Sequence, residues 1–193
     1  MRLIIKKRGN NLKTFSTPYL AGELNLSEMN FKKGKMKHQT KFKIGEKAPD
    51  FSGKDKDGKT IQLKDFKGKK VILFFYPKDN TPGCTIQNCD LRDNYAKLKK
   101  KGFEIIGVSA DSEASHLKFS SRFSLPFPLI ADVDHKIIKA YDVWGEKSLF
   151  GVKYKGLVRT TFVIDEKGKI ELIITKVKTA GHAEQILNEL KIN

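Results

Sequence analysis

From residue 44 onward, hydrophobic and polar positions follow patterns that predict regular secondary structure. The longest apolar run covers residues 71–76 and is continuous, as expected for a strand buried on both faces of a sheet. Residues 85–100 show helical periodicity instead, and Gly102 is placed to end that helix. Its apolar stripe consists of Ile86, Cys89, Leu91, Tyr95 and Leu98.

The remaining segments are predicted to be short strands and helices that alternate along the chain, as in an α/β protein. Residues 56–59 contain an Asp-Gly pair between two short strands, which is a strong hairpin signal. Further strands are predicted at residues 103–109, 129–131, 159–165 and 169–176, and further helices at 113–123, 134–141 and 181–191. This order predicts a three-layer α/β domain with a mixed central sheet, as in a thioredoxin-like fold. The pattern leaves the order of the strands open.

Residues 1–40 show no sustained periodicity, and we expect a basic, flexible extension followed by a domain over residues 41–193. Residues 1–43 hold 11 Lys and Arg against 2 acidic residues, whereas the rest of the chain holds 27 against 20. The excess positive charge of residues 1–43 can attract nucleic acid or an anionic membrane. A chromatin- or membrane-associated binding protein is therefore one alternative. The basic start also has some features of an organelle transit peptide, but its basic residues are mostly lysine. We favour a cytoplasmic protein that binds neither nucleic acid nor membrane.

Bulk composition excludes several other classes. No apolar run approaches the 20 or so residues that cross a bilayer. Two cysteines are too few for a disulfide-stapled scaffold or a four-cysteine zinc site, and the four histidines are scattered, so we expect no metal. A thiol pair without an export signal indicates a reducing compartment, where cysteines serve chemistry more than architecture.

The candidate chemistry lies in the loop and helix start over residues 75–89. This segment follows a buried strand and opens a helix, which is where open α/β sheets build their sites. Cys84 falls in the first helical turn, where free backbone N–H groups and the helix dipole favour a thiolate. Thr81 lies three residues earlier and can offer its hydroxyl to the sulfur or to a bound oxygen. The alternative reading of Cys84 is a small buried residue that fills space.

Two further residues are open to both functional and structural readings. Arg159 begins an otherwise apolar predicted strand. It is either a residue of the functional site or a partner in a surface ion pair with an acidic residue. Cys89 belongs either to the chemistry of Cys84 or to the core stripe of its helix.

The same segment resembles the active-site signature of the peroxiredoxin family, on the motif Pro77-x-x-x-Thr81-x-x-Cys84. The motif Thr81-Pro82-Gly83-Cys84-Thr85-x-x-x-Cys89 is similar to that of the bacterioferritin-comigratory-protein or PrxQ subfamily. Similarity extends from about residue 44 to residue 190 and leaves out residues 1–40. Its other motifs, in order, lie at residues 47–51, 107–109, 127–129, 144–147 and 156–165.

The resemblance implies a peroxidase that needs no metal, haem or flavin. Cys84 would attack hydrogen peroxide or an organic hydroperoxide and become a sulfenic acid, and Cys89 would condense with it to an intramolecular disulfide. A thioredoxin- or glutaredoxin-type reductant would reopen this bond. Thr81 and Arg159 would bind the peroxide, and Pro77 would shield the pocket from water. We expect a monomer.

Two positions depart from the subfamily pattern, since Gln87 and Asn88 stand where Glu-Ala is often found. We expect this change to tune the helix and the surface that meets the reductant, without removing activity.

A dithiol–disulfide oxidoreductase on the same fold is the alternative within redox chemistry. Those enzymes typically carry C-x-x-C at the helix start, whereas four residues separate Cys84 from Cys89. Consumption of hydrogen peroxide, compared with turnover of protein disulfides, distinguishes the two activities.

Overall fold

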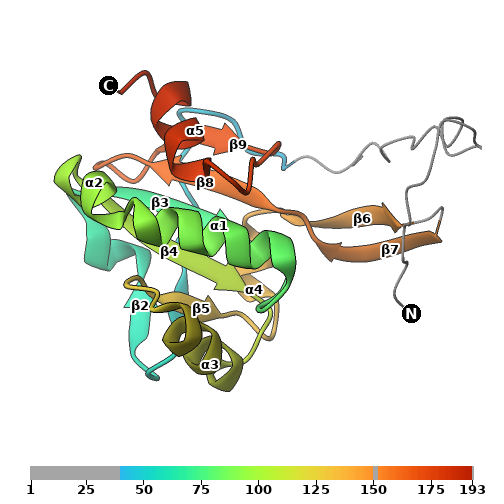
Figure 1. The fold of residues 1–193 in the computed structure, drawn as a ribbon. Helices are drawn as coiled ribbons and strands as arrows, with labels where there is room; N and C mark the ends of the chain where they lie inside the picture. The colour runs from blue at the N-terminus through green and yellow to red at the C-terminus, as the bar shows by residue number, and fades with distance from the viewer. Residues whose placement is uncertain (1–39, 150–151, 193) are drawn as a thin grey trace, which may run out of the picture. The chain divides into compact units, whose positions relative to one another are not determined.

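A five-stranded mixed sheet forms the centre of the computed structural model, which describes residues 40–149 and 152–192. The sheet has the order β5-β4-β3-β8-β9; β3, β4 and β5 run parallel, and β8 and β9 are antiparallel to their neighbours (Figure 1). Its strands are β3 (Lys70–Phe75), β4 (Phe103–Ser109), β5 (Leu129–Ala131), β8 (Thr160–Ile164) and β9 (Ile170–Ile174). The predicted mixed sheet is therefore confirmed, and the structure supplies the strand order. The predicted extension over residues 1–40 lies outside the described residues, apart from Thr40.

The central strand β3 is buried on both faces, as its continuous apolar run predicts. Alternate side chains enter two separate hydrophobic clusters because successive residues of a strand point to opposite faces. One cluster receives Ile72 and Phe74 together with Tyr76 just beyond the strand, and the other receives Val71, Leu73 and Phe75.

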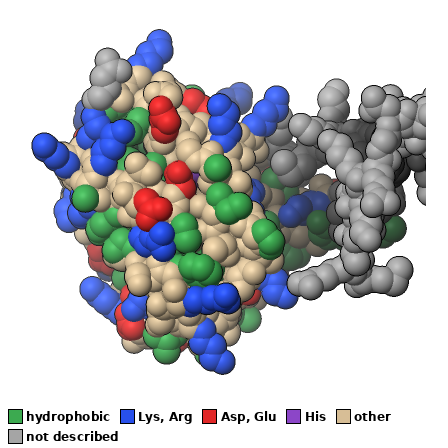
Figure 2. Space-filling view, viewed as in Figure 1, with side chains coloured by type: hydrophobic (Ala, Val, Ile, Leu, Met, Phe, Trp, Pro, Cys, Tyr) green, Lys and Arg blue, Asp and Glu red, His purple; other side chains and the backbone are tan. Residues whose placement is uncertain are grey.

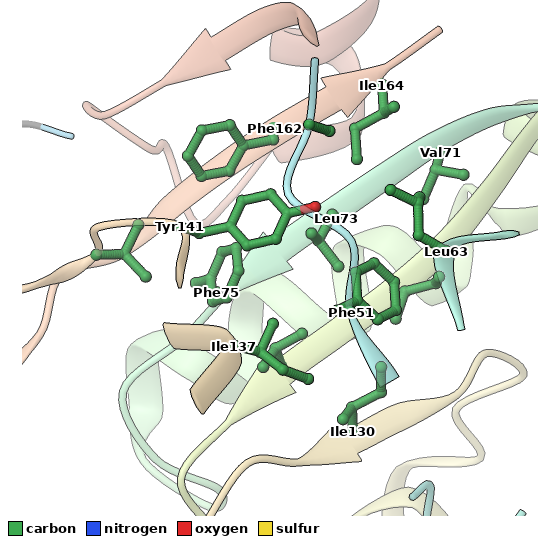
Figure 3. Packing of buried hydrophobic residues seen from close by; sticks show 14 of the residues in the cluster. Phe51, Leu63, Val71, Leu73, Phe75, Ile130, Ile137, Tyr141, Phe162 and Ile164 are labelled. Atoms are coloured by element: carbon green, nitrogen blue, oxygen red, sulfur yellow. The ribbon is translucent and has the colours of Figure 1, made fainter. Parts of the chain in front are cut away.

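Helices cover one face of the sheet and a mixed layer covers the other. The helical face carries α1 (Pro82–Asp93), α2 (Tyr95–Lys100), α3 (Glu113–Phe123) and α5 (His182–Glu189). The opposite face carries the hairpin β1 (Ser52–Lys54) and β2 (Thr60–Gln62), the 3-10 helix η1 (Leu63–Phe66) and α4 (Lys136–Ala140). On that side Phe51, Leu63, Ile137 and Tyr141 pack against β3 and β8 (Figure 3). The three layers agree with the predicted architecture.

The single helix predicted over residues 85–100 is wrong, because the structure contains two helices that meet at Asn94. The Asn94 side-chain amide donates to the carbonyl of Asp90 at 2.9 Å, and its backbone leaves helical geometry with φ −98° and ψ 7°. Asn side chains compete in this way with the hydrogen bonds of a helix. The predicted stripe is also wrong at its start, since Ile86 is 48% exposed.

A second antiparallel hairpin, absent from the sequence prediction, connects α4 to β8. It consists of β6 (Trp144–Leu149) and β7 (Val152–Leu157), and it extends away from the central sheet (Figure 1). Val152 is 68% exposed and Tyr154 is 44% exposed, so much of β7 has no core to pack against. The two strands are therefore held mainly by pairing with each other.

Candidate active site

The loop that follows β3 delivers Cys84 to the N-terminal end of α1. Thr81 is the N-cap residue, Pro82 begins the helix, and Cys84 is its third residue with only 1% of its surface exposed. The first intrahelical hydrogen bond here joins the Thr85 amide to the Thr81 carbonyl at 2.9 Å. The amides of Gly83 and Cys84 precede that bond and have no acceptor within the helix. The predicted place of Cys84 in the first turn agrees with the structure.

Arg159 reaches Cys84 because of the way β3 and β8 pair. Antiparallel register sets Phe75 opposite Thr160, so the residue before β8 lies beside the carboxyl end of β3, where α1 begins. The Arg159 Nη2 group donates to the Cys84 Sγ atom at 3.1 Å, and its Nη1 group donates to Oε1 of Gln87. A fixed positive charge thus faces the sulfur, and a guanidinium suits this role because its donors form a rigid fork.

Gln87 and Asn88 are wholly buried, each with 0% of its surface exposed. Gln87 accepts the hydrogen bond from Arg159, and the Asn88 side-chain amide donates to the carbonyl of Cys84 at 2.9 Å. The expectation that these positions tune a surface for the reductant is therefore wrong. Their side chains instead hold Arg159 and the turn that carries Cys84.

Thr81 and Pro77 lie in the loop that enters this site. The Thr81 hydroxyl donates to the Lys78 carbonyl at 2.9 Å, which uses its only hydrogen and leaves its oxygen able to accept. Pro77 is half-buried directly after Tyr76. Thr81 is thus at the N-cap of α1, but its hydroxyl donates to Lys78 and not to the Cys84 sulfur, while the shielding role of Pro77 stays a prediction.

Cys89 is half-buried on the same helix, and both thiols are free. Five residues of regular helix separate two Cα atoms by roughly 8.6 Å, given a rise of about 1.5 Å and about 100° per residue. A disulfide rarely spans more than about 7 Å between Cα atoms. The structure therefore brings Arg159 to Cys84 and sets Thr81 at the N-cap of the same helix, and a regular α1 keeps Cys89 beyond bonding reach of Cys84.

Lys147 on β6 is a second cation near the site, which sequence reasoning did not single out for a role. Its Nζ group donates to the Leu157 carbonyl at 2.8 Å. Burial lowers the pKa of Lys147, the charge of Arg159 lowers it further, and Cys84 acts in the opposite direction. The motif at residues 144–147, noted only as part of the resemblance, was the available signal.

The start of α5 is tied to α1 beside this site. The carboxylate of Asp90, next to Cys89 in the chain, accepts hydrogen bonds from the amides of Gly181 at 2.9 Å and Ala183 at 2.8 Å. His182 is fully buried, and its Nε2 atom lies 2.9 Å from the hydroxyl of Thr161 on β8. Burial lowers the pKa of His182 from the ordinary 6.5 to about 4, so the imidazole is neutral at pH 7.

This buried imidazole predicts a loss of stability in mild acid. The unfolded chain binds a proton near pH 6.5 but the folded chain only near pH 4, so the free energy of unfolding falls as pH drops through this window. The shift corresponds to about 3 kcal/mol at most, reached by about pH 4 and constant below it. Urea unfolding of wild type and His182→Gln at pH 7 and pH 4.5 measures it. An equal loss of stability in both proteins would contradict the assignment to His182.

Over the described ranges, no three His, Cys, Asp or Glu side chains are grouped so that they could hold a metal ion. No helix there is long and apolar enough to span a bilayer. The chemistry that the site offers is that of a buried thiol facing a guanidinium and free backbone amides, an arrangement that can stabilise negative charge on sulfur and on a neighbouring oxygen.

A family model and individual relatives both match the part of the chain that forms the described domain. A family model described as the AhpC/TSA family matches residues 44–173. The putative peroxiredoxin bcp of Coxiella burnetii is 45% identical over 149 residues, which cover 77% of this chain and 99% of that protein. The peroxiredoxin Bcp of Bacillus subtilis is 46% identical over 150 residues, covering 78% and 96% respectively.

Solved structures agree with these relatives. Peroxiredoxin Q of Xanthomonas campestris is 36% identical with a TM-score of 0.69, covering 73% of this chain and 89% of that one. A mutant of PrxQ from Xylella fastidiosa is 32% identical with a TM-score of 0.74, covering 79% and 98%.

The chain therefore belongs to the AhpC/TSA family. Within it, the relatives and the solved structures are peroxiredoxins of the Bcp and PrxQ type, which confirms the predicted resemblance and the thioredoxin-like fold. The predicted class of enzyme, a thiol-dependent peroxidase, is confirmed as well.

Proposed function

We propose that Cys84 is the peroxidatic cysteine and Cys89 the resolving cysteine of this peroxidase. The observation that carries the proposal is the 3.1 Å hydrogen bond from the Arg159 guanidinium to the Cys84 sulfur at the start of a helix. A cation and free amides at a helix N-terminus stabilise the thiolate, which is the form of cysteine that attacks.

In the first step, the Cys84 thiolate attacks one oxygen of the peroxide bond. A sulfur–oxygen bond forms as the oxygen–oxygen bond breaks, and the departing oxygen takes up a proton to leave as water or an alcohol. We expect Arg159, which donates to the sulfur, and the amides of Gly83 and Cys84 to stabilise charge on the reacting atoms. Because the Thr81 hydroxyl donates to Lys78, we expect Thr81 to accept a hydrogen bond from the peroxide.

In the second step, the Cys89 sulfur attacks the sulfenic acid of Cys84. A disulfide forms and water leaves, and two electrons from an external dithiol later restore both thiols. We propose a thioredoxin- or glutaredoxin-type protein as that dithiol.

The burial of Cys84 favours this function over a dithiol–disulfide oxidoreductase. Only 1% of the residue is exposed, which suits attack on a small peroxide and hinders attack on a disulfide of another protein. One solved relative, the bacterioferritin comigratory protein of Xanthomonas campestris, is described by its alkyl peroxide reduction activity. We accordingly propose both hydrogen peroxide and alkyl hydroperoxides as substrates.

The deciding experiment compares two activities of the wild-type protein. With thioredoxin and its reductase present, we expect steady consumption of hydrogen peroxide and of an alkyl hydroperoxide. With insulin as a disulfide substrate, we expect no reduction above the thioredoxin background. Reduction of insulin without consumption of peroxide would establish the alternative.

Formation of the disulfide predicts a local change in α1. Since a regular helix keeps the Cα atoms of Cys84 and Cys89 roughly 8.6 Å apart, the turn between them must unwind before the sulfurs can bond. We expect backbone amides of residues 84–92 to exchange hydrogen much faster in the disulfide form than in the reduced form.

Hydrogen exchange followed by mass spectrometry measures this change, with α3 as an internal reference that should keep its protection in both forms. Equal protection of residues 84–92 in both forms, with the disulfide verified by mass, would rule out the unwinding.

We also propose that the protein is monomeric and cytoplasmic. The large exposed hydrophobic residues of the described part include Ile86 on α1, Leu117 on α3 and Val133 in the turn before α4, besides Val152 and Tyr154 on β7. On the face that carries α1 and α5, hydrophobic side chains form small groups between charged ones, and Lys and Arg are spread among Asp and Glu (Figure 2). Sedimentation analysis of the full chain tests the monomer.

A further inference from the structure

A buried polar cluster lies beneath the loop that leads to Cys84 and has no part in the chemistry described so far. The carboxylate of Asp79 is its centre, and Tyr76 and His116 are wholly buried beside it. One Asp79 oxygen accepts a hydrogen bond from the Tyr76 hydroxyl at 2.8 Å. The other accepts one from the Ser115 hydroxyl at 2.7 Å and lies 2.9 Å from Nδ1 of His116.

Both ring nitrogens of His116 face hydrogen-bond acceptors. Nδ1 meets the Asp79 carboxylate, and Nε2 lies 3.2 Å from the carbonyl of Ile130 on β5. Burial raises the pKa of Asp79, but the hydrogen bond and charge of His116, with Ser115 and Tyr76, outweigh it and leave the pKa below its ordinary value. A neutral imidazole has a single N–H donor, so satisfying two acceptors requires the doubly protonated ring.

The cluster fixes both the backbone and the side chain of the loop. The Asp79 amide donates to the Asp111 carboxylate at 2.9 Å, so Asp79 is held from two sides. Asn80, the next residue, adopts the left-handed conformation with φ 56°, which Asn takes more readily than most other non-glycine residues. Thr81, the N-cap of α1, follows directly.

We propose that Asp79 and a doubly protonated His116 form a buried ion pair that positions the loop of residues 77–81 for peroxide binding. The pair touches none of the reacting atoms, and it acts by holding Thr81 and the start of α1 in place. Small displacements of such groups lower rates strongly, since attack requires near-ideal geometry. The proposal rests on the proposed function of Cys84.

The charge state of His116 is tested directly by nitrogen-15 NMR of the imidazole ring at neutral pH. We expect the wild type to show protons on both ring nitrogens of His116, and Asp79→Asn to show a neutral ring. A wild-type ring with a single N–H would overturn the ion pair. This readout does not depend on peroxidase activity, so it separates failure of this inference from failure of the proposed function.

The positioning role is tested by two rates of Cys84 in the same proteins. In Asp79→Asn we expect the rate of oxidation by hydrogen peroxide to fall tenfold or more, while alkylation by iodoacetamide changes less than twofold. A fall in the oxidation rate alone indicates that peroxide is no longer held correctly next to Cys84. General damage to the site would change both the oxidation rate and the alkylation rate. A peroxide rate equal to that of wild type would overturn the role.

Two further variants keep the test independent of folding. Ser120→Ala is the matched control, because Ser120 is buried on α3 one turn after His116 and its hydroxyl donates to the Leu125 carbonyl, away from the loop. We expect it to lose some stability and to keep its peroxide rate. Ser115→Ala removes one donor to Asp79 and keeps the ion pair, so its peroxide rate should fall about threefold even if Asp79→Asn does not fold. No fall in Ser115→Ala would count against the positioning role.

Discussion

Cys84→Ser is expected to lose all peroxide reduction, because the serine hydroxyl stays protonated and is a poor nucleophile where the thiolate attacks. Serine is close to cysteine in size, so it fits the position at 1% exposure without a large change in packing. The measurement is peroxide consumption in the presence of thioredoxin and its reductase, compared with the rate in the absence of the protein.

Cys89→Ser serves as the matched variant, since it changes the same chemical group on the same helix. It should consume one equivalent of peroxide and then stop with a sulfenic acid at Cys84, which dimedone labelling and mass spectrometry detect. Substantial turnover by Cys84→Ser, or loss of the first equivalent in Cys89→Ser, would contradict the assignment of roles.

Much of the fold could be predicted because its central strands are encoded locally. The apolar run that forms β3 and the turn residues beside the short strands are visible within a few positions. The β6–β7 hairpin was missed because it has little buried face, and four of the six residues of β7 are exposed. A strand is predicted from alternation between hydrophobic and polar positions, and β7 lacks this alternation because most of its residues are exposed on both faces.

The candidate site could be predicted only where one short segment carries it. Cys84, Thr81 and Pro77 lie within eight residues of each other, and helix physics alone points to Cys84. The burial of Gln87 was not predictable from local periodicity, because the partner that draws it inward, Arg159, is 72 residues away in sequence. The same holds for Asp79, because its partner His116 lies 37 residues further on and no local pattern joins the two residues.

Arg159→Ala is expected to slow the reaction of Cys84 with peroxide by tenfold or more. Its guanidinium donates to the sulfur at 3.1 Å, so the change removes the positive charge that, in the proposed mechanism, stabilises both the thiolate and the oxygen that departs. A tenfold loss corresponds to about 1.4 kcal/mol of transition-state stabilisation. Rapid-quench measurement of Cys84 oxidation gives the rate, with Arg122→Ala as control because Arg122 is exposed on α3 and stacks on Phe123.

Two comparisons separate the role of Arg159 in chemistry from a role in structure. Arg159→Lys keeps the charge but lacks the rigid fork that reaches Cys84 and Gln87 together, so its rate should lie between those of wild type and Arg159→Ala. Because the proposed role of the guanidinium covers the departing oxygen as well as the sulfur, oxidation by peroxide should fall further than alkylation by iodoacetamide in Arg159→Ala. If both rates remained at their wild-type values while the free energy of unfolding fell, Arg159 would serve only to hold α1 against β8.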